Sequence, residues 1–258
     1  MTKTHFRSLH HTGQPLVLPN AWDAGSARLI EQAGAAAIAT TSAGVAWSLG
    51  AGDGGAIGRR AAVDLVARVV ATVNVPVTAD IEDGYGDVGA TVRGVLDAGA
   101  VGVNLEDGLA SPAEHEERIR AARRVGDLFL NARVDTYLRG LGDPATRLRD
   151  TLDRAAAYVA AGADGIFVPG VTDRETIAAL AEQLPAPLNV MVGPGSPTVD
   201  ELADLGVARV SVGPAITLAA YAAARRAARE LLTAGTYDAL DVDLGFAETE
   251  ALLGHPHG

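Results

Sequence analysis

Short runs of apolar and β-branched residues alternate with longer stretches of helical periodicity from one end of the chain to the other. Such runs, bounded by Gly, Pro, Asn or Asp, are typical of buried strands. Eight runs fit this description: residues 15–22, 35–43, 75–82, 101–107, 128–135, 164–170, 187–193 and 208–214. The pattern therefore predicts eight strands.

Between the strands, Ala, Leu and Arg recur at helical spacing, and four of these stretches end at a glycine predicted to follow a helix: Gly34, Gly99, Gly162 and Gly206. Eight strand–helix units favour an α/β fold, most simply a (β/α)₈ TIM-type barrel. We expect one domain over residues 1–258, with the barrel at about 15–216 and the last helix and C-terminal tail at 217–258. An open doubly wound sheet is the alternative, but no GxGxxG motif follows the first strand.

Two segments depart from this regular pattern. A long Gly-rich connection, residues 44–60, separates the second strand from its helix. The tail contains a short amphipathic stretch, FAETEALL (246–253), which is too short to be stable alone. We expect the tail to pack on another surface, with exchange between subunits as one arrangement.

Composition excludes several classes of function. The formal net charge is −11, which disfavours nucleic acid and an anionic membrane as partners. The chain has no cysteine, which excludes disulfides, thiolate metal sites and cysteine nucleophiles. No stretch approaches the ~20 apolar residues of a membrane span, and the polar N-terminus lacks the apolar core of a signal peptide. We therefore expect a soluble, cytoplasmic protein.

Polar side chains gather at the ends of three consecutive strands, the end that carries the active site in barrel enzymes. Asp80 and Glu82 are two residues apart and point to one face, and the same spacing relates Asn104 to Glu106 and Asn131 to Arg133. Clustered carboxylates are costly unless a cation offsets their charge. Oxygen ligands without cysteine favour Mg²⁺, with Mn²⁺ as a second option. The metal ligands predicted on this basis are Asp80, Glu82 and Glu106.

Each of these residue types also has a structural interpretation. Carboxylates that follow a strand often cap the next helix, which suits Asp83, Asp87 and Asp107. Arg133 either neutralises the acidic cluster or grips a substrate carboxylate with two hydrogen bonds. His115 lies in the first turn of a helix whose start is marked by Ser111, Pro112 and Glu114. We expect His115 to be solvated, which disfavours a Ser-His-Asp triad.

Six segments together resemble the isocitrate lyase/phosphoenolpyruvate mutase superfamily: LPNAWDAGSARLIEQAG, TTSAGVAWSLGAGDGG, ADIEDGYGD, GVNLEDG, NARVDTYL and PLNVMVGPGSPTVDELADLGVARVSVGP. The resemblance covers roughly residues 15–230. It implies a (β/α)₈ barrel that binds Mg²⁺ and a small anionic 2-oxo or 2-hydroxy acid. Members of the superfamily break or form C–C or P–C bonds next to a metal-bound enolate. They are often tetramers that exchange their last helix, which implies a homo-oligomer, dimer or tetramer.

The resemblance assigns roles position by position. Asp80, Glu82 and Glu106 match the metal-binding positions, with Glu82 standing where the family usually has Asp. The implied catalytic residues are Asp53, Tyr85 and Arg133, and the implied substrate-binding residues are Thr41, Ser42, Ala43, Asp80, Arg133 and Asn189.

One departure from the family pattern leaves the reaction open. The segment after Glu106, DGLASPAEHEERI, lacks the K-[KR]-C-G-H loop of isocitrate and methylisocitrate lyases, and the mutase-type gating loop is also missing. The leading hypothesis is a Mg²⁺-dependent lyase that cleaves or forms a C–C bond of a small 2-oxo or 2-hydroxy carboxylate. The alternatives are P–C chemistry, as in a phosphonomutase or phosphonopyruvate hydrolase, and a non-catalytic oxo-acid binding protein. The general base stays open among Asp53, Tyr85 and a metal-bound hydroxide.

Overall fold

The computed structural model describes residues 3–254 of the chain. Nine parallel strands form one sheet in the order β1-β9-β8-β7-β6-β5-β4-β3-β2. Each of the eight predicted runs contains a strand, and the first contains two. The strands are β1 Leu16–Leu18, β2 Asn20–Ala21, β3 Ile38–Thr40, β4 Val77–Asp80, β5 Gly102–Glu106, β6 Phe129–Arg133, β7 Gly165–Val168, β8 Leu188–Met191 and β9 Arg209–Ser211.

Pro19 divides the first predicted strand. Proline has no backbone N–H to donate to a neighbouring strand, and it interrupts the ladder here. β1 pairs with β9, whereas β2 pairs with β3. Because β1 and β2 are joined by this single residue, the sheet curls into a nearly closed barrel. The predicted TIM-type α/β fold is confirmed.

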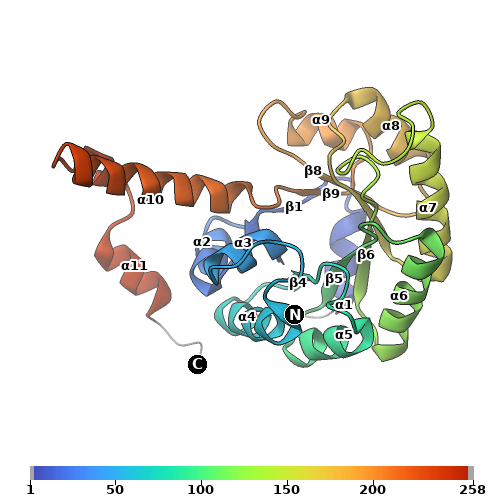
Figure 1. Ribbon diagram of the computed structural model, residues 1–258, viewed down its shortest axis with the longest axis horizontal. Coiled ribbons are helices and arrows are strands. Elements are labelled where there is room, and N and C mark those ends of the chain that lie inside the picture. Colours follow the sequence, from blue (N-terminus) through green and yellow to red (C-terminus); the bar gives the residue numbers. More distant parts are fainter. Residues whose placement is uncertain (1–2, 255–258) are drawn as a thin grey trace.

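Helices surround the barrel (Figure 1). They are α1 Lys3–Ser8, α2 Ala24–Gln32, α3 Ser42–Ser48, α4 Gly58–Thr72, α5 Val88–Asp97, α6 Pro112–Val125, α7 Arg147–Ala161, α8 Arg174–Gln183, α9 Val199–Asp204, α10 Ala215–Thr233 and α11 Phe246–Leu253, with 3₁₀ turns η1 Leu9–His11 and η2 Asp238–Leu240. The four glycines predicted to follow helices all have a positive φ, between 85° and 119°. Apolar residues on the outer faces of the strands, such as Leu105, Leu130 and Val190, are fully buried against these helices.

The N-terminal segment closes the end of the barrel opposite the strand ends that carry the polar cluster. Phe6 of α1 packs with Leu16, Val101 and Phe129, which lie at or next to the starts of strands. The His10 ring stacks on Phe129 at a centroid distance of 4.0 Å. Among the described residues, this packing fills one end of the barrel, and the polar cluster lies at the other end.

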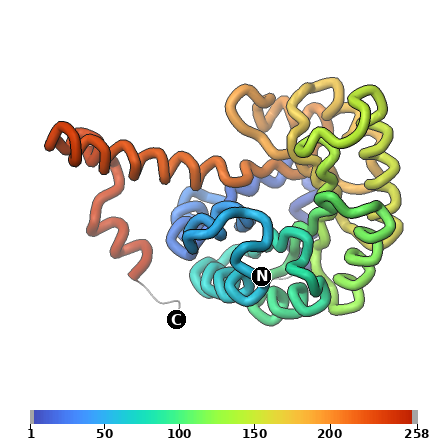
Figure 2. The backbone as a smooth tube through the Cα atoms, viewed as in Figure 1, coloured from blue at the N-terminus to red at the C-terminus, as the bar shows by residue number. Residues whose placement is uncertain are grey.

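The Gly-rich connection and the C-terminal tail are the two segments that departed from the regular pattern in the sequence. The Gly-rich connection was expected at residues 44–60, but α3 occupies residues 42–48, so the irregular part is shorter. At the C-terminus, α10 projects away from the barrel and α11 turns back toward it (Figures 1 and 2). Arg28 Nε of α2 donates to the Leu252 carbonyl at 3.3 Å, so part of the tail packs on its own barrel. Exchange of this segment between subunits stays a prediction.

Within residues 3–254, no helix combines the length and the apolar character needed to cross a membrane. The 19-residue α10 is the longest helix in this part of the chain, but it carries three arginines.

His115 is not solvated, contrary to the sequence prediction. The predicted helix start is confirmed, since Ser111 and Glu114 form a reciprocal capping box with Pro112 in the first turn. His115, however, is 0% exposed and its ring lies against Tyr158 at 4.5 Å. Neither ring nitrogen has a hydrogen-bond partner. Burial lowers the pKa of His115 to about 3, so the ring is neutral at physiological pH.

This burial predicts acid sensitivity of the fold. Between the ordinary histidine pKa near 6.5 and the folded value of about 3, only the unfolded chain takes up this proton, so stability falls as the pH falls. At pH 5 the effect of His115 amounts to about 2 kcal/mol. We expect His115→Phe to flatten the decline of Tm between pH 7.5 and pH 5, measured by differential scanning fluorimetry. His11→Gln is the matched control, because His11 is exposed; an equally flattened profile in that variant would contradict the assignment.

Candidate active site

The stretch TADIEDGYGD folds into the end of β4 and a left-handed turn. Glu82, Gly84, Tyr85 and Gly86 all have a positive φ, of 50°, 98°, 52° and 81°. A side chain at Gly84 would overlap Val88, so only glycine fits there. Glu82 and Tyr85 adopt the same region at a cost of order 1 kcal/mol each. The turn holds them together, because Tyr85 OH donates to Glu82 Oε1 at 2.9 Å.

Asp80, the last residue of β4, is held by neutral donors. Its Oδ2 accepts from the Ser42 amide at 3.3 Å and the Ser42 hydroxyl at 3.1 Å, and its Oδ1 accepts from the Glu82 amide at 3.2 Å. The ion pairs found within residues 3–254 do not include this carboxylate. Burial raises the pKa of Asp80, and the positive charge of Arg133 only partly opposes this effect. Asp80 is therefore a partly buried acid that lacks a cation in direct contact within residues 3–254.

Arg133, at the end of β6, is clamped by two carboxylates. Its Nη1 pairs with Glu106 at 2.7 Å, while Nε and Nη2 donate to the two oxygens of Asp135 at 2.6 and 3.1 Å. Burial alone would lower the pKa of Arg133, but Glu106, Asp135 and Asp80 outweigh it and raise the pKa. Three of the five guanidinium N–H groups are used in this way. Two remain for an anionic ligand.

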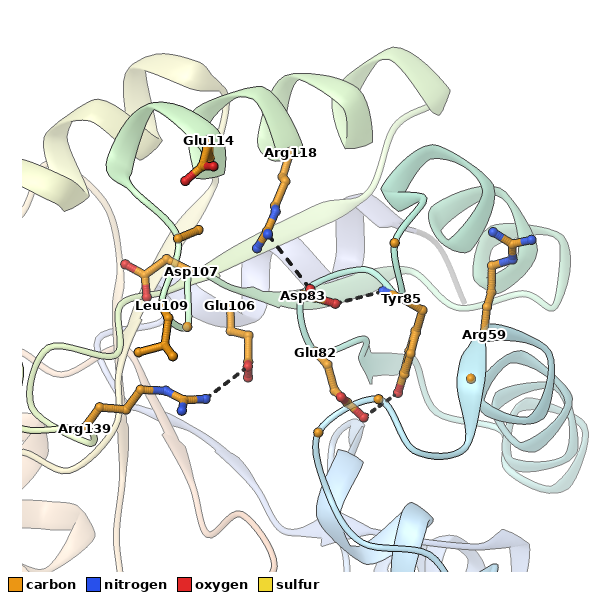
Figure 3. A pocket seen from close by; sticks show the side chains of 16 residues that line it. Arg59, Glu82, Asp83, Tyr85, Glu106, Asp107, Leu109, Glu114, Arg118 and Arg139 are labelled. Atoms are coloured by element: carbon orange, nitrogen blue, oxygen red, sulfur yellow. Dashed lines mark hydrogen bonds and ion pairs between the residues drawn. The ribbon is translucent and has the colours of Figure 1, made fainter.

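Two hollows lie at this end of the barrel. The first, here called the inner cavity, has a volume of about 210 Å³ and is lined by Asp80, Arg133, Thr41, Ser42, Ala43, Asp53, Asn20, Asn104 and Ser211, with apolar walls from Leu138, Phe167 and Met191. The second, here called the outer groove, measures about 680 Å³ and is lined by Glu82, Tyr85 and Glu106, with Arg59, Arg118 and Arg139 among its other walls. Figure 3 shows the outer groove, with Glu106 facing Arg139 and Glu82 facing Tyr85.

The three predicted metal ligands are thus divided between neighbouring hollows. Asp80 lines the inner cavity, whereas Glu82 and Glu106 line the outer groove. Over residues 3–254, no three His, Asp or Glu side chains are gathered closely enough to hold a metal ion by themselves. Mg²⁺ commonly binds through one or two carboxylates and keeps several waters. A partly buried Asp80 without a cation in contact among the described residues, beside further carboxylate oxygens, fits that cation in donor chemistry.

Comparison with known proteins decides the family. The family model for phosphoenolpyruvate phosphomutase matches residues 6–232. The chain belongs to this family. The resemblance that the sequence motifs indicated is confirmed.

Relatives of this family match nearly the whole chain. An uncharacterised protein of Mycobacterium tuberculosis is 41% identical over 96% of this chain and 95% of its own length. The 2-methylisocitrate lyase of Salmonella typhimurium is 31% identical over 88% of this chain and 85% of its own. Among solved structures, a phosphonopyruvate hydrolase in complex with oxalate and Mg²⁺ has a TM-score of 0.86 at 26% identity, covering 98% of this chain and 95% of that one.

Within the family fold, the remaining predicted residues take different positions. Asp53, on the loop between α3 and α4, lines the inner cavity, but Tyr85 lines the outer groove. Burial and the charge of Glu82 raise the pKa of Tyr85, so its hydroxyl stays protonated. Asn189 lies within the barrel below the inner cavity and its amide is engaged by Asn131, Ser211 and backbone carbonyls. The structure does not bring Asn189 to the cavity wall.

The three carboxylates interpreted as helix caps have different roles in the structure. Asp87 caps α5 by accepting from the Ala90 amide at 2.9 Å, which confirms that interpretation. Asp83 supports the turn through the Tyr85 amide at 3.0 Å. Asp107 does not cap a helix: its side chain is fully buried and accepts from Tyr158 OH, Arg154 and the Asp135 amide. Asp107 thereby supports the strand end that carries Arg133.

The sequence interpretation missed Arg209 and gave no role to Asn20. Asn20 Oδ1 accepts from the Val212 and Gly213 amides at 3.0 and 2.9 Å, which ties β2 to the segment after β9. Arg209 lies inside the barrel and is 1% exposed. Its signal in the sequence was its place two residues before Ser211 on an apolar strand, since that spacing turns both side chains to the barrel interior.

Proposed function

We propose that this protein is a Mg²⁺-dependent lyase that cleaves or forms a C–C bond of a small 2-oxo or 2-hydroxy carboxylate. The observation that supports this most directly is the inner cavity, where Asp80, Ser42 and Arg133 line one small space. Its volume of about 210 Å³ is below the ~300 Å³ at which pockets for drug-sized ligands begin. A small dicarboxylate suits a space of this size.

Substrate binding rests on charge complementarity in a buried space. The two remaining N–H groups of Arg133 would bind the substrate carboxylate as a bidentate pair. Asp80, with Glu82 and Glu106 through waters, would hold Mg²⁺, or Mn²⁺ in its place. When bound, the cation supplies a Lewis acid that stabilises negative charge developing on the 2-oxygen of the substrate. Relatives of this chain include proteins named oxaloacetate decarboxylase and 2-methylisocitrate lyase, whose names refer to small carboxylic acids.

Proton transfer is assigned to Asp53 rather than Tyr85. Asp53 lines the inner cavity, whereas Tyr85 lines the outer groove and donates a hydrogen bond to Glu82. Asp53 would accept a proton from the substrate or return one, depending on whether the bond is broken or formed. Tyr85 would hold Glu82 in place.

A second candidate is P–C bond chemistry. It is favoured by the description of the matching family model and by the likeness to solved structures of a phosphoenolpyruvate phosphomutase and a phosphonopyruvate hydrolase. C–C and P–C bond cleavage would both use an oxo-acid pocket beside Mg²⁺, so the inner cavity suits either reaction. The two reactions differ in that P–C chemistry also needs groups that receive the phosphoryl moiety.

One experiment tests these functions together. Purified protein is mixed with oxaloacetate, 2-methylisocitrate, phosphonopyruvate or phosphoenolpyruvate, and the products are followed by ¹H and ³¹P NMR with Mg²⁺ or with EDTA. We expect a Mg²⁺-dependent product from an acid without phosphorus. A product from the phosphonate or phosphate substrates alone would favour P–C chemistry. Mg²⁺-dependent broadening of ligand signals without any product would favour a non-catalytic binding protein.

A further inference from the structure

A network of amides crosses the barrel interior just below the inner cavity. Asn131 Nδ2 donates to Asn104 Oδ1 at 2.9 Å and to Asn189 Oδ1 at 3.0 Å. Asn189 Nδ2 in turn donates to Ser211 Oγ at 3.2 Å. These side chains come from β5, β6, β8 and β9, so the network links four strands. An amide can be turned either way round, and its direction depends on what its neighbours can offer.

Arg209 is a member of this network that cannot reverse, as are the Val190 and Arg209 carbonyls that accept from Asn189 Nδ2. A guanidinium only donates hydrogen bonds, and Arg209 Nη2 donates to Asn104 Oδ1 at 3.2 Å. Burial lowers the pKa of Arg209 to about 9, so the group is still protonated at neutral pH. Its Nε and Nη1 have no hydrogen-bond partner although they are buried. A buried cation with so few partners is costly to the fold, which indicates a role other than stability.

The orientation of Asn104 follows from these contacts. Its Oδ1 faces two donors, Asn131 Nδ2 and Arg209 Nη2, and is thereby fixed toward the barrel interior. Asn104 also lines the inner cavity, next to Asp80 in the register of β4 and β5. Its Nδ2 is then the part of the amide that is available to a ligand. Were the amide reversed, Nδ2 would meet two donors and Oδ1 would face the anion.

We propose that Arg209 is a positioning residue that fixes the amide of Asn104 so that its Nδ2 donates to an oxygen of the acid in the inner cavity. Asn104 then joins Arg133 as a donor that selects an anionic ligand. The proposal rests on the proposed oxo-acid site and adds to it a residue that the ligand never touches.

The test is a double-mutant cycle on oxalate affinity, measured by calorimetry in the presence of Mg²⁺. Arg209→Met removes one of the two donors that hold Asn104 Oδ1 and should weaken oxalate binding up to about 10-fold, the effect of one hydrogen bond to a charged oxygen. Asn104→Ala should weaken it similarly. Because Arg209 acts through Asn104, the double variant should bind no more weakly than Asn104→Ala alone. Arg209→Lys, which also can only donate, should keep most of the affinity.

Additive losses in the double variant would overturn the proposal, since Arg209 would then act on the ligand by its own charge. Val190→Ala is the matched control for stability, because it removes buried apolar volume from the opposite face of β8 and leaves the amides in place. It should lower Tm without changing oxalate affinity. An equal loss of affinity in this control would show that binding simply follows stability.

A ligand-free measurement separates this proposal from the proposed function. In the free protein, the side-chain ¹H–¹⁵N signals of Asn104, identified by their loss in Asn104→Ala, should shift in Arg209→Met and stay in place in Arg209→Lys. If the unaltered protein binds no oxalate with Mg²⁺, the proposed function fails and these signals still decide the role of Arg209. Unshifted signals in Arg209→Met would overturn it.

Discussion

Replacing Asp80 with Ala should abolish the Mg²⁺-dependent binding of oxalate, with affinity reduced at least ~100-fold. Asp80 is the predicted metal ligand that lines the inner cavity, and its carboxylate has no cation in contact among the described residues. Loss of a metal that stabilises charge by several kcal/mol corresponds to a loss of this size or larger. Calorimetric titration of oxalate with Mg²⁺ or with EDTA measures it directly.

The matched control for this variant is Asp87→Asn. Asp87 belongs to the same decapeptide and loses the same unit of charge, but it lies outside both hollows and caps α5. Asparagine caps a helix about as well as aspartate, so stability should hardly change. Affinity retained in Asp80→Ala would mean that the cation is held by Glu82 and Glu106 in the outer groove alone.

The fold could be predicted from the sequence because its signals are local and repeated. Every predicted strand run holds a strand, since apolar stretches of that length bounded by turn residues have few other solutions. The break in the first strand could be predicted at Pro19, which lacks a backbone N–H. Only the strand pairing shows that β1 and β2 lie at opposite edges of the sheet, with β1 next to β9 and β2 next to β3. Helix α3 was not predicted, because its start lies in a Gly- and Ser-rich segment with weak helix propensity.

The sequence predicted which strand-end residues point into the barrel, but it did not predict the positions of residues beyond the strand ends. The spacing of two residues placed Asp80 and Arg133 on inward faces, and both line the inner cavity. Glu82 departs from the strand pattern because it already lies in the left-handed turn, where φ is 50°, and the alternation of faces no longer applies. The burial of His115 depends on Tyr158 from a helix more than 40 residues away, which no local pattern reveals.

Replacing Arg133 with Lys is expected to weaken oxalate binding about 100-fold while the protein stays folded. Lysine keeps the positive charge between Glu106 and Asp135 but lacks the planar pair of N–H groups that binds a carboxylate at two points. Two lost hydrogen bonds to a charged group, at about 1.5 kcal/mol each, correspond to a change of this size. Calorimetry with Mg²⁺ gives the affinity, and thermal unfolding gives the stability.

Arg139→Lys distinguishes ligand binding by Arg133 from neutralisation of the acidic cluster. Arg139 pairs with the same two carboxylates, with Glu106 at 3.6 Å and Asp135 at 2.9 Å, but it lies in the outer groove. If Arg133 serves mainly to neutralise those carboxylates, both substitutions should lower Tm and neither should affect oxalate strongly. If Arg133 grips the ligand, only Arg133→Lys should lose affinity, because Arg133 lines the inner cavity and Arg139 does not. Equal affinity in both variants would place the anion outside the inner cavity.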